Sequence, residues 1–143
     1  AIERFVHVAT RDFCEEEYEV VKSSKGRHRL FTDHEIKCRS FEGELWQTIS
    51  QEIVRRLPEN VYVSFDIDGL DPSLCPSTGT PVPGGLGIEQ AFYLLSQMVA
   101  SGHKIIGFDL CEVGVGKGTL DANVGMRVLY RLSCLAGKSQ GKI

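Results

Sequence analysis

The chain has 143 residues, which fits one ordinary domain, and its 42% hydrophobic and 24% charged residues are typical of a folded globular protein rather than a disordered one. Its formal net charge is −3 and its 16 basic residues form no basic run, which argues against nucleic-acid binding. No apolar stretch reaches the roughly 18 residues that would cross a membrane, and the five cysteines form no C-x-x-C pair, which favours reduced thiols in the cytoplasm.

The first half of the chain alternates short strands with polar and amphipathic segments. The apolar run Phe5 to Ala9 predicts a buried strand, a polar loop with an acidic cluster at 15–17 follows, and a second strand is expected at 29–32. Ser40 is a suitable N-cap for one amphipathic helix over 41–57, where apolar residues recur every four positions.

The second half contains the clearest strand, at 61–68, in which apolar and polar residues alternate. The stretch 69–87, rich in Pro, Gly, Ser and Thr, is long for a plain connection, and such loops are often functional. The remaining elements are a helix at 88–99 stopped by Gly102, a strand at 104–110, and a last helix capped by Asp121 or Asn123. This order of strands and helices predicts an α/β fold with a mainly parallel sheet and no linker between domains.

Acidic residues follow two of the predicted strands. Ligands of a parallel α/β sheet bind beyond the carboxyl ends of its strands. Asp66 and Asp68 end the strand at 61–68, and their spacing of two predicts carboxylates on the same side of the sheet. Glu112 follows the strand at 104–110, so we expect it at the same rim. Close carboxylates repel one another unless a cation lies between them, which favours a hard divalent metal ion.

Other interpretations of these residues remain open. Aspartates at strand ends also cap turns, and Glu112 taken alone fits a solvated loop. The four histidines show no ligand spacing and are expected to be structural, and Cys75 and Cys111 lack a histidine partner in sequence. A calcium loop and a haloacid-dehalogenase phosphatase motif both fail at Leu70.

Three segments resemble one known family. The string SFDIDGLDPSLCPSTGTPVPGG at 64–85 resembles a long signature of the ureohydrolases, which include arginase, agmatinase and formimidoylglutamase. GFDLCEV at 107–113 is similar to the family's strand with its substrate-binding glutamate, and VATRDFCEEE at 8–17 to a strand before its mid-chain helix. The resemblance implies a three-layer α/β/α fold with a mainly parallel sheet, of which residues 1–143 form the C-terminal part.

The resemblance also implies roles for single residues. Asp66 matches an aspartate that bridges two manganese ions, and Asp68 matches an aspartate that binds one of them. Glu112 matches the glutamate that pairs with the guanidinium or amidine group of the substrate, and Thr80 belongs to a TGTP loop that lines the pocket. Asp109 is similar to an aspartate that lies behind the metal ligands.

The implied reaction is the manganese-dependent hydrolysis of a linear guanidino or amidine C–N bond. Two Mn²⁺ ions per complete site would lower the pKa of a shared water, and a carboxylate would pair with the planar cation of the substrate. The implied partner is therefore a small guanidino or amidine molecule, and a homo-oligomer is expected for a full-length protein.

The sequence also departs from the family pattern. Two earlier metal motifs, of the form G-G-D-H and D-A-H-x-D, are not in these 143 residues, and none of the four histidines matches theirs. We therefore expect a C-terminal half that is a poor catalyst alone. The alternatives are a non-catalytic binding or oligomerisation domain and a magnesium-dependent, phosphatase-like hydrolase.

Overall fold

Parallel strands and helices make up the part of the chain that the computed structural model describes, residues 2–114 and 120–143. In chain order the elements are β1 (Phe5–Thr10), α1 (Glu15–Ser23), β2 (His28–Thr32), α2 (Asp33–Phe41), α3 (Trp46–Val54), β3 (Asn60–Asp66), a 3₁₀ turn (Ile67–Gly69), α4 (Ile88–Ala100), β4 (Lys104–Cys111) and α5 (Leu120–Ser139). None of the described helices combines the length and the apolar character that a membrane crossing requires.

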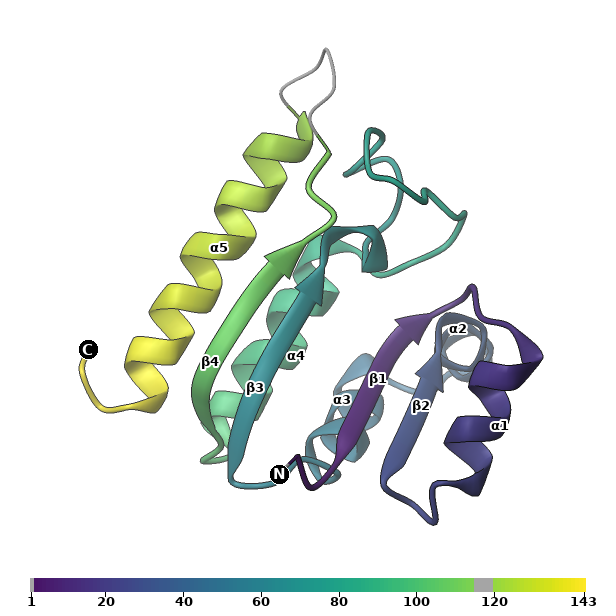
Figure 1. Cartoon of the computed structure of the whole chain (residues 1–143). Coiled ribbons are helices and arrows are strands. Elements are labelled where there is room, and N and C mark those ends of the chain that lie inside the picture. The colour runs from purple at the N-terminus through teal and green to yellow at the C-terminus, as the bar shows by residue number, and fades with distance from the viewer. Residues whose placement is uncertain (1, 115–119) are drawn as a thin grey trace.

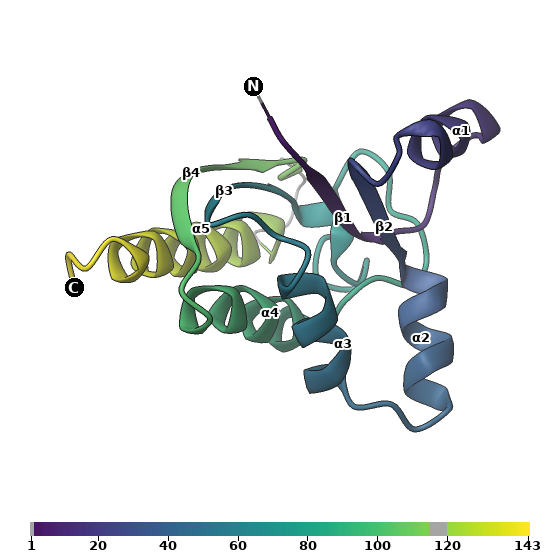
Figure 2. The same cartoon turned by 90° about the horizontal axis from the view of Figure 1, so that it is seen from below.

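The strands form two parallel pairs. β1 pairs with β2 and β3 pairs with β4, and in Figure 1 all four strands point toward the same end of the molecule. Helices α2, α3, α4 and α5 lie on one face of the strands, while α1 lies on the opposite side (Figure 2). The α/β fold with parallel strands between helices, predicted from the sequence, is confirmed.

Within the described ranges, one hydrophobic core lies between the strands and the helices on the more heavily covered face. Its fully buried members include Phe31 of β2, Ile49 of α3, Ile67 of the 3₁₀ turn and Val128 of α5. In β3, Val61 is buried, whereas the neighbouring Tyr62 is 59% exposed on the other face. This alternation is the one predicted from the sequence, because successive side chains of a strand point to opposite faces.

The acidic cluster at 15–17 is the start of a helix, so the predicted loop is wrong. Glu17 closes the first turn of α1, since its Oε2 accepts a hydrogen bond of 2.8 Å from the backbone N–H of Cys14. Acidic residues in a first turn also suit the positive end of the helix dipole. The helix buries none of its residues, so its sequence lacks the apolar periodicity that reveals a packed helix.

The helix predicted over 41–57 is present but shorter, because residue 41 ends α2 and α3 covers only Trp46–Val54 of that range. α2 is capped by Thr32, while Ser40 lies inside its last turn. Gly43, with φ of +94°, separates α2 from α3. Phe41 and Leu45 fit the four-residue spacing of the apolar side chains of α3, so the sequence suggested that they belong to the same helix face. In the structure they are 84% and 67% exposed.

Candidate functional site

The carboxyl ends of β3 and β4 lie side by side. Asp66, the last residue of β3, is the register partner of Cys111, the last residue of β4. Glu112 follows Cys111 directly, so the structure brings Asp66 and Glu112 to one rim, as the sequence predicted. We call this edge, with Asp66, Asp68 and Glu112, the acidic rim.

Asp68 lies at the acidic rim in a different local structure from the predicted strand. The strand ends at Asp66, and Asp68 lies in the 3₁₀ turn Ile67–Gly69, which the N–H of Leu70 closes by donating to the carbonyl of Ile67 at 3.0 Å. The prediction that both aspartates share one strand face is therefore wrong. The two carboxylates still interact, because the charge of Asp68 raises the pKa of Asp66.

The electrostatics of the rim centre on Asp66. Partial removal of water is the largest cause that raises the pKa of Asp66 above its usual value, followed by the negative charges of Asp68, Glu112 and Asp109. Asp109 shows the opposite shift, because the hydroxyl of Ser64 donates to its Oδ1 at 2.8 Å and lowers its pKa. The rim therefore gathers negative charge around a carboxylate that is disfavoured as an anion, which is an environment that a cation would relieve.

Glu112 adopts a backbone conformation that is rare for its type. Its φ is +60°, in the left-handed region where a residue with a side chain is strained by about 1–2 kcal/mol. The hydroxyl of Thr78 donates to the carbonyl of Glu112 at 2.9 Å and helps to hold this conformation. A Cβ at Gly79 would lie 3.0 Å from Oε2 of Glu112, so the absence of a side chain there leaves room for the carboxylate. Strain of this kind is often found at functional sites.

The loop at 70–87 is held against the rim by side chains from several elements. Thr80 is exposed in this loop, whereas the buried threonine that contacts Glu112 is Thr78. The attachments are a backbone bridge between Leu70 and Leu86, Asp121 accepting from the N–H of Ser77 at 3.0 Å, Arg11 donating to the carbonyl of Val82 at 3.0 Å, and Lys37 donating to the carbonyl of Gly85 at 3.0 Å. Asp121 thus lies buried inside the first turn of α5, not at the predicted cap, and residues 115–119 before this helix lie outside the described ranges.

Arg11 is a residue of this site that sequence reasoning placed in a plain polar loop. Its Nη2 donates to the carbonyls of Asp68 at 2.6 Å and of Leu70 at 3.3 Å, in addition to its bond to Val82. The buried Ala9, with φ of +64° at an irregularity of β1, turns the chain just before it. The sequence position of Arg11 could have indicated a role at this site, since Arg11 follows the carboxyl end of the first predicted strand.

The carboxylates of the acidic rim are suitable ligands for a hard divalent cation, but they are too few to complete its coordination. Carboxylate oxygens are the ligands such ions prefer. Within residues 2–114 and 120–143, however, no group of three or more His, Cys, Asp or Glu side chains could hold a metal ion. The histidines have other neighbours: His7 with His28 at 3.1 Å, His34 with Cys38 at 3.6 Å, and His103 with the carbonyl of Pro58 at 2.7 Å. Asp66 and Asp68 therefore fit part of a coordination sphere.

The chain is similar to known hydrolases in sequence. A family model described as "Arginase family" matches residues 1–133. Arginase-1 of Rattus norvegicus is 28% identical over 140 residues, which cover 95% of this chain and 42% of that protein. N(1)-aminopropylagmatine ureohydrolase of Thermus thermophilus is 48% identical over 62 residues, which cover 43% of this chain and 21% of that protein. The chain thus spans less than half the length of these relatives.

The fold is also similar to those of solved structures. Proclavaminate amidino hydrolase from Streptomyces clavuligerus superposes with a TM-score of 0.76 and 26% identity, covering 94% of this chain and 43% of that one. Arginase from Bacillus caldovelox superposes with a TM-score of 0.73 and 27% identity, covering 95% of this chain and 44% of that one.

Proposed function

Because this chain belongs to the arginase family, we propose that it supplies part of the active site of a manganese-dependent ureohydrolase. In this proposal Asp66 and Asp68 are metal ligands, Glu112 binds the planar cation of the substrate, and Thr80 lies beside the pocket. Asp109 supports the rim from behind, through its hydrogen bond with Ser64. The substrate is a linear guanidino or amidine compound, and residues 1–143 form the C-terminal part of the catalytic domain.

The observation that carries this proposal is that three carboxylates from two distant segments of the chain lie at one edge of the sheet. Asp66 and Glu112 follow from the register of β3 and β4, and Asp68 joins them through the 3₁₀ turn. The strained backbone of Glu112 and the space left by Gly79 further support a role for its carboxylate beyond that of a solvated loop residue.

The proposed division of labour follows from the chemistry of these side chains. Manganese ions, when bound, supply a hydroxide at neutral pH by lowering the pKa of water. Asp66 and Asp68 contribute anionic oxygens toward holding the ions. Glu112 pairs with two N–H groups of a guanidinium or amidinium and fixes the plane of the substrate. The loop at 70–87 limits the movement of the substrate and the access of bulk water.

Binding of Mn²⁺ to the isolated chain tests the metal assignment. The paramagnetic ion is expected to broaden the amide signals of residues 66–68 and 111–113 first. Asp66→Asn and Asp68→Asn should abolish this selective broadening, because each removes an anionic donor. Glu59→Gln is the matched control, since Glu59 is an exposed acid at the other end of β3, paired with Lys104 at 2.9 Å. Broadening that starts at the acidic first turn of α1 would contradict the assignment.

The number of metal sites is a separate prediction. Titration calorimetry with the isolated chain should show no pair of tight Mn²⁺ sites at micromolar concentration, because two aspartates cannot fill two coordination spheres. Two tight sites would overturn the assignment of this chain to a partial site.

The role of Glu112 is testable in a protein that carries this sequence together with the remaining metal ligands. Glu112→Gln should lower kcat/KM for urea release from arginine or agmatine by roughly 100-fold, because a charge-assisted pair with the substrate is lost. Manganese content, measured by elemental analysis, should not change. Hydrolysis of p-nitrophenyl phosphate in place of guanidino compounds would contradict the proposed reaction.

A further inference from the structure

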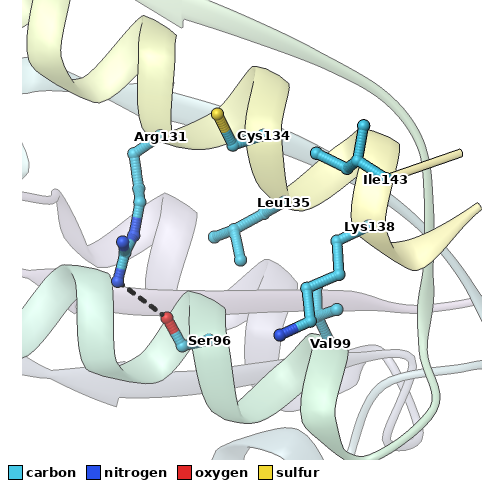
Figure 3. Close-up of a pocket in the computed structure, with 7 residues that line it drawn as sticks. All are labelled: Ser96, Val99, Arg131, Cys134, Leu135, Lys138 and Ile143. Carbon is cyan, nitrogen blue, oxygen red and sulfur yellow. Dashed lines mark hydrogen bonds between the residues drawn. The ribbon is translucent and has the colours of Figure 1, made fainter. Parts of the chain in front are cut away.

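A groove of about 400 Å³ runs between α4 and α5, away from the acidic rim. Its lining residues are Ser96, Val99, Arg131, Cys134, Leu135, Lys138 and Ile143 (Figure 3). The C-terminal part of α5 lies near the start of β4, since Ser139 accepts a hydrogen bond of 3.0 Å from the N–H of Ile105. The groove is therefore at the end of the molecule opposite the rim, and its chemistry is independent of the proposed catalytic site.

Arg131 is exposed and contacts two side chains of α4. Its Nη2 donates to Oγ of Ser96 at 3.2 Å, and its guanidinium carbon lies 5.3 Å from the centre of the Phe92 ring. The Ser96 hydroxyl in turn donates to the carbonyl of Phe92 at 2.7 Å. A guanidinium with one hydrogen bond of this kind keeps further N–H donors for a ligand.

The groove has two cationic side chains and no acidic residue in its lining. Arg131 and Lys138 extend from α5 toward α4 on either side of Leu135 (Figure 3). Among the described residues, no carboxylate forms an ion pair with either of them. The two cationic side chains favour an anionic ligand.

The walls of the groove are mainly hydrocarbon. Val99 is half-buried, Leu135 is buried, and Ile143 is 79% exposed at the lip. Inorganic phosphate would satisfy Arg131 but would leave these surfaces in water. An organic anion with an apolar tail would pair with the guanidinium and also cover Leu135 and Ile143.

From this combination of an arginine that contacts both Ser96 and Phe92, a second cation and apolar walls, we propose that the groove between α4 and α5 binds a small carboxylic acid with a hydrocarbon tail. The carboxylate pairs with Arg131, Lys138 adds a second positive charge, and the tail lies along Val99, Leu135 and Ile143. The volume accommodates a medium-chain acid and falls in the lower part of the usual range for small-molecule sites.

Titration of the ¹⁵N-labelled chain with sodium octanoate, hexanoate and acetate tests the proposal. Saturable shifts are expected in the amide signals of residues 92–99 and 131–138. Each methylene that enters the groove should tighten binding about fourfold, so octanoate binds best and acetate worst. Octylamine, with the same tail and the opposite charge, should cause no saturable shift.

Two matched variants separate the groove from general charge effects. Arg131→Met should weaken octanoate binding roughly tenfold or more, because it removes charge-assisted hydrogen bonds. Arg127→Met is the control and should bind normally, since Arg127 is an exposed arginine of the same helix that pairs with Asn123 and does not line the groove. Thermal unfolding by circular dichroism checks that both variants fold, and Lys138→Met offers a second, milder loss of charge.

Three results would overturn the proposal. These are shifts that do not saturate, octanoate binding that Arg131→Met leaves unchanged, and inorganic phosphate that binds as tightly as octanoate. The last would indicate a simple anion site in which the apolar walls take no part.

Discussion

At the scale of single residues, His7 and His28 contact each other across β1 and β2, with ring nitrogens 3.1 Å apart. Burial, and then the neighbouring His28, lower the pKa of His7 below the ordinary imidazole value. The unfolded chain therefore binds a proton more readily than the folded one, so stability falls as pH drops through about 6.5 and the loss is complete below the lowered pKa.

We therefore expect the free energy of unfolding to decrease as the pH falls through about 6.5. The substitution His7→Phe should flatten this dependence while keeping the ring stack with Phe5. Urea unfolding at a series of pH values measures this free energy. The exposed His34 provides the control, since His34→Phe should retain the slope. An unchanged slope in His7→Phe would show that other groups cause the pH dependence.

Gly85 gives a second prediction at this scale. Its φ is +90°, and a Cβ there would lie 2.5 Å from the carbonyl oxygen of Leu70, a backbone atom that cannot turn away. Gly85→Ala should cost about 3 kcal/mol or more, from backbone strain and overlap together. Gly102→Ala carries only the strain, because its φ is +92° with no heavy atom within 4 Å, and should cost about 1 kcal/mol. Equal losses in denaturant unfolding would contradict this account.

At the scale of elements, the loop at 70–87 depends on side chains from distant parts of the chain. Arg11 contacts both the start of this loop and Val82, and Lys37 contacts only Gly85 near its end. Arg11→Met should destabilise the fold by about 2–4 kcal/mol, since several hydrogen bonds to a charged group are lost. It should also speed proteolytic cleavage within 70–87 far more than Lys37→Met does. Similar cleavage rates in the two variants would show that Arg11 is not the main attachment.

Local sequence patterns are sufficient to predict elements that bury one face. The alternation in β3 and the apolar spacing of α4 come from burial on one face, so the sequence revealed both elements. α1 was not predicted because it has no buried face. The start of α3 was predicted too early, because the apolar spacing continues in the sequence across Gly43, where the chain leaves α2. The closeness of Asp66 and Glu112 was predictable because strand ends share an edge. Arg11 was not recognised because most of its partners are backbone carbonyls more than fifty residues away.

At the scale of the whole molecule, one core joins the two strand pairs. Its buried members include Ala9 of β1, Ile53 of α3, Ile105 of β4 and Val128 of α5. A shared core predicts one cooperative unfolding transition. Trp46, the only tryptophan, donates to the carbonyl of Gln90 at 3.1 Å and so reports the contact between α3 and α4. Its fluorescence should change at the same denaturant concentration as the far-UV circular dichroism. Two separate midpoints would indicate that the strand pairs unfold independently.

The pairing of the strands has a consequence for the exchange of backbone hydrogens with solvent. Among the described residues, β3 pairs only with β4, and β1 pairs only with β2. Each strand therefore has one side on which its backbone has no hydrogen-bonded neighbouring strand. Successive amides of a strand point alternately to its two sides. Deuterium uptake along β3 should therefore alternate between slow and fast from one residue to the next. A strand that came to lie against this side would slow the fast amides selectively, so exchange rates would map its position residue by residue.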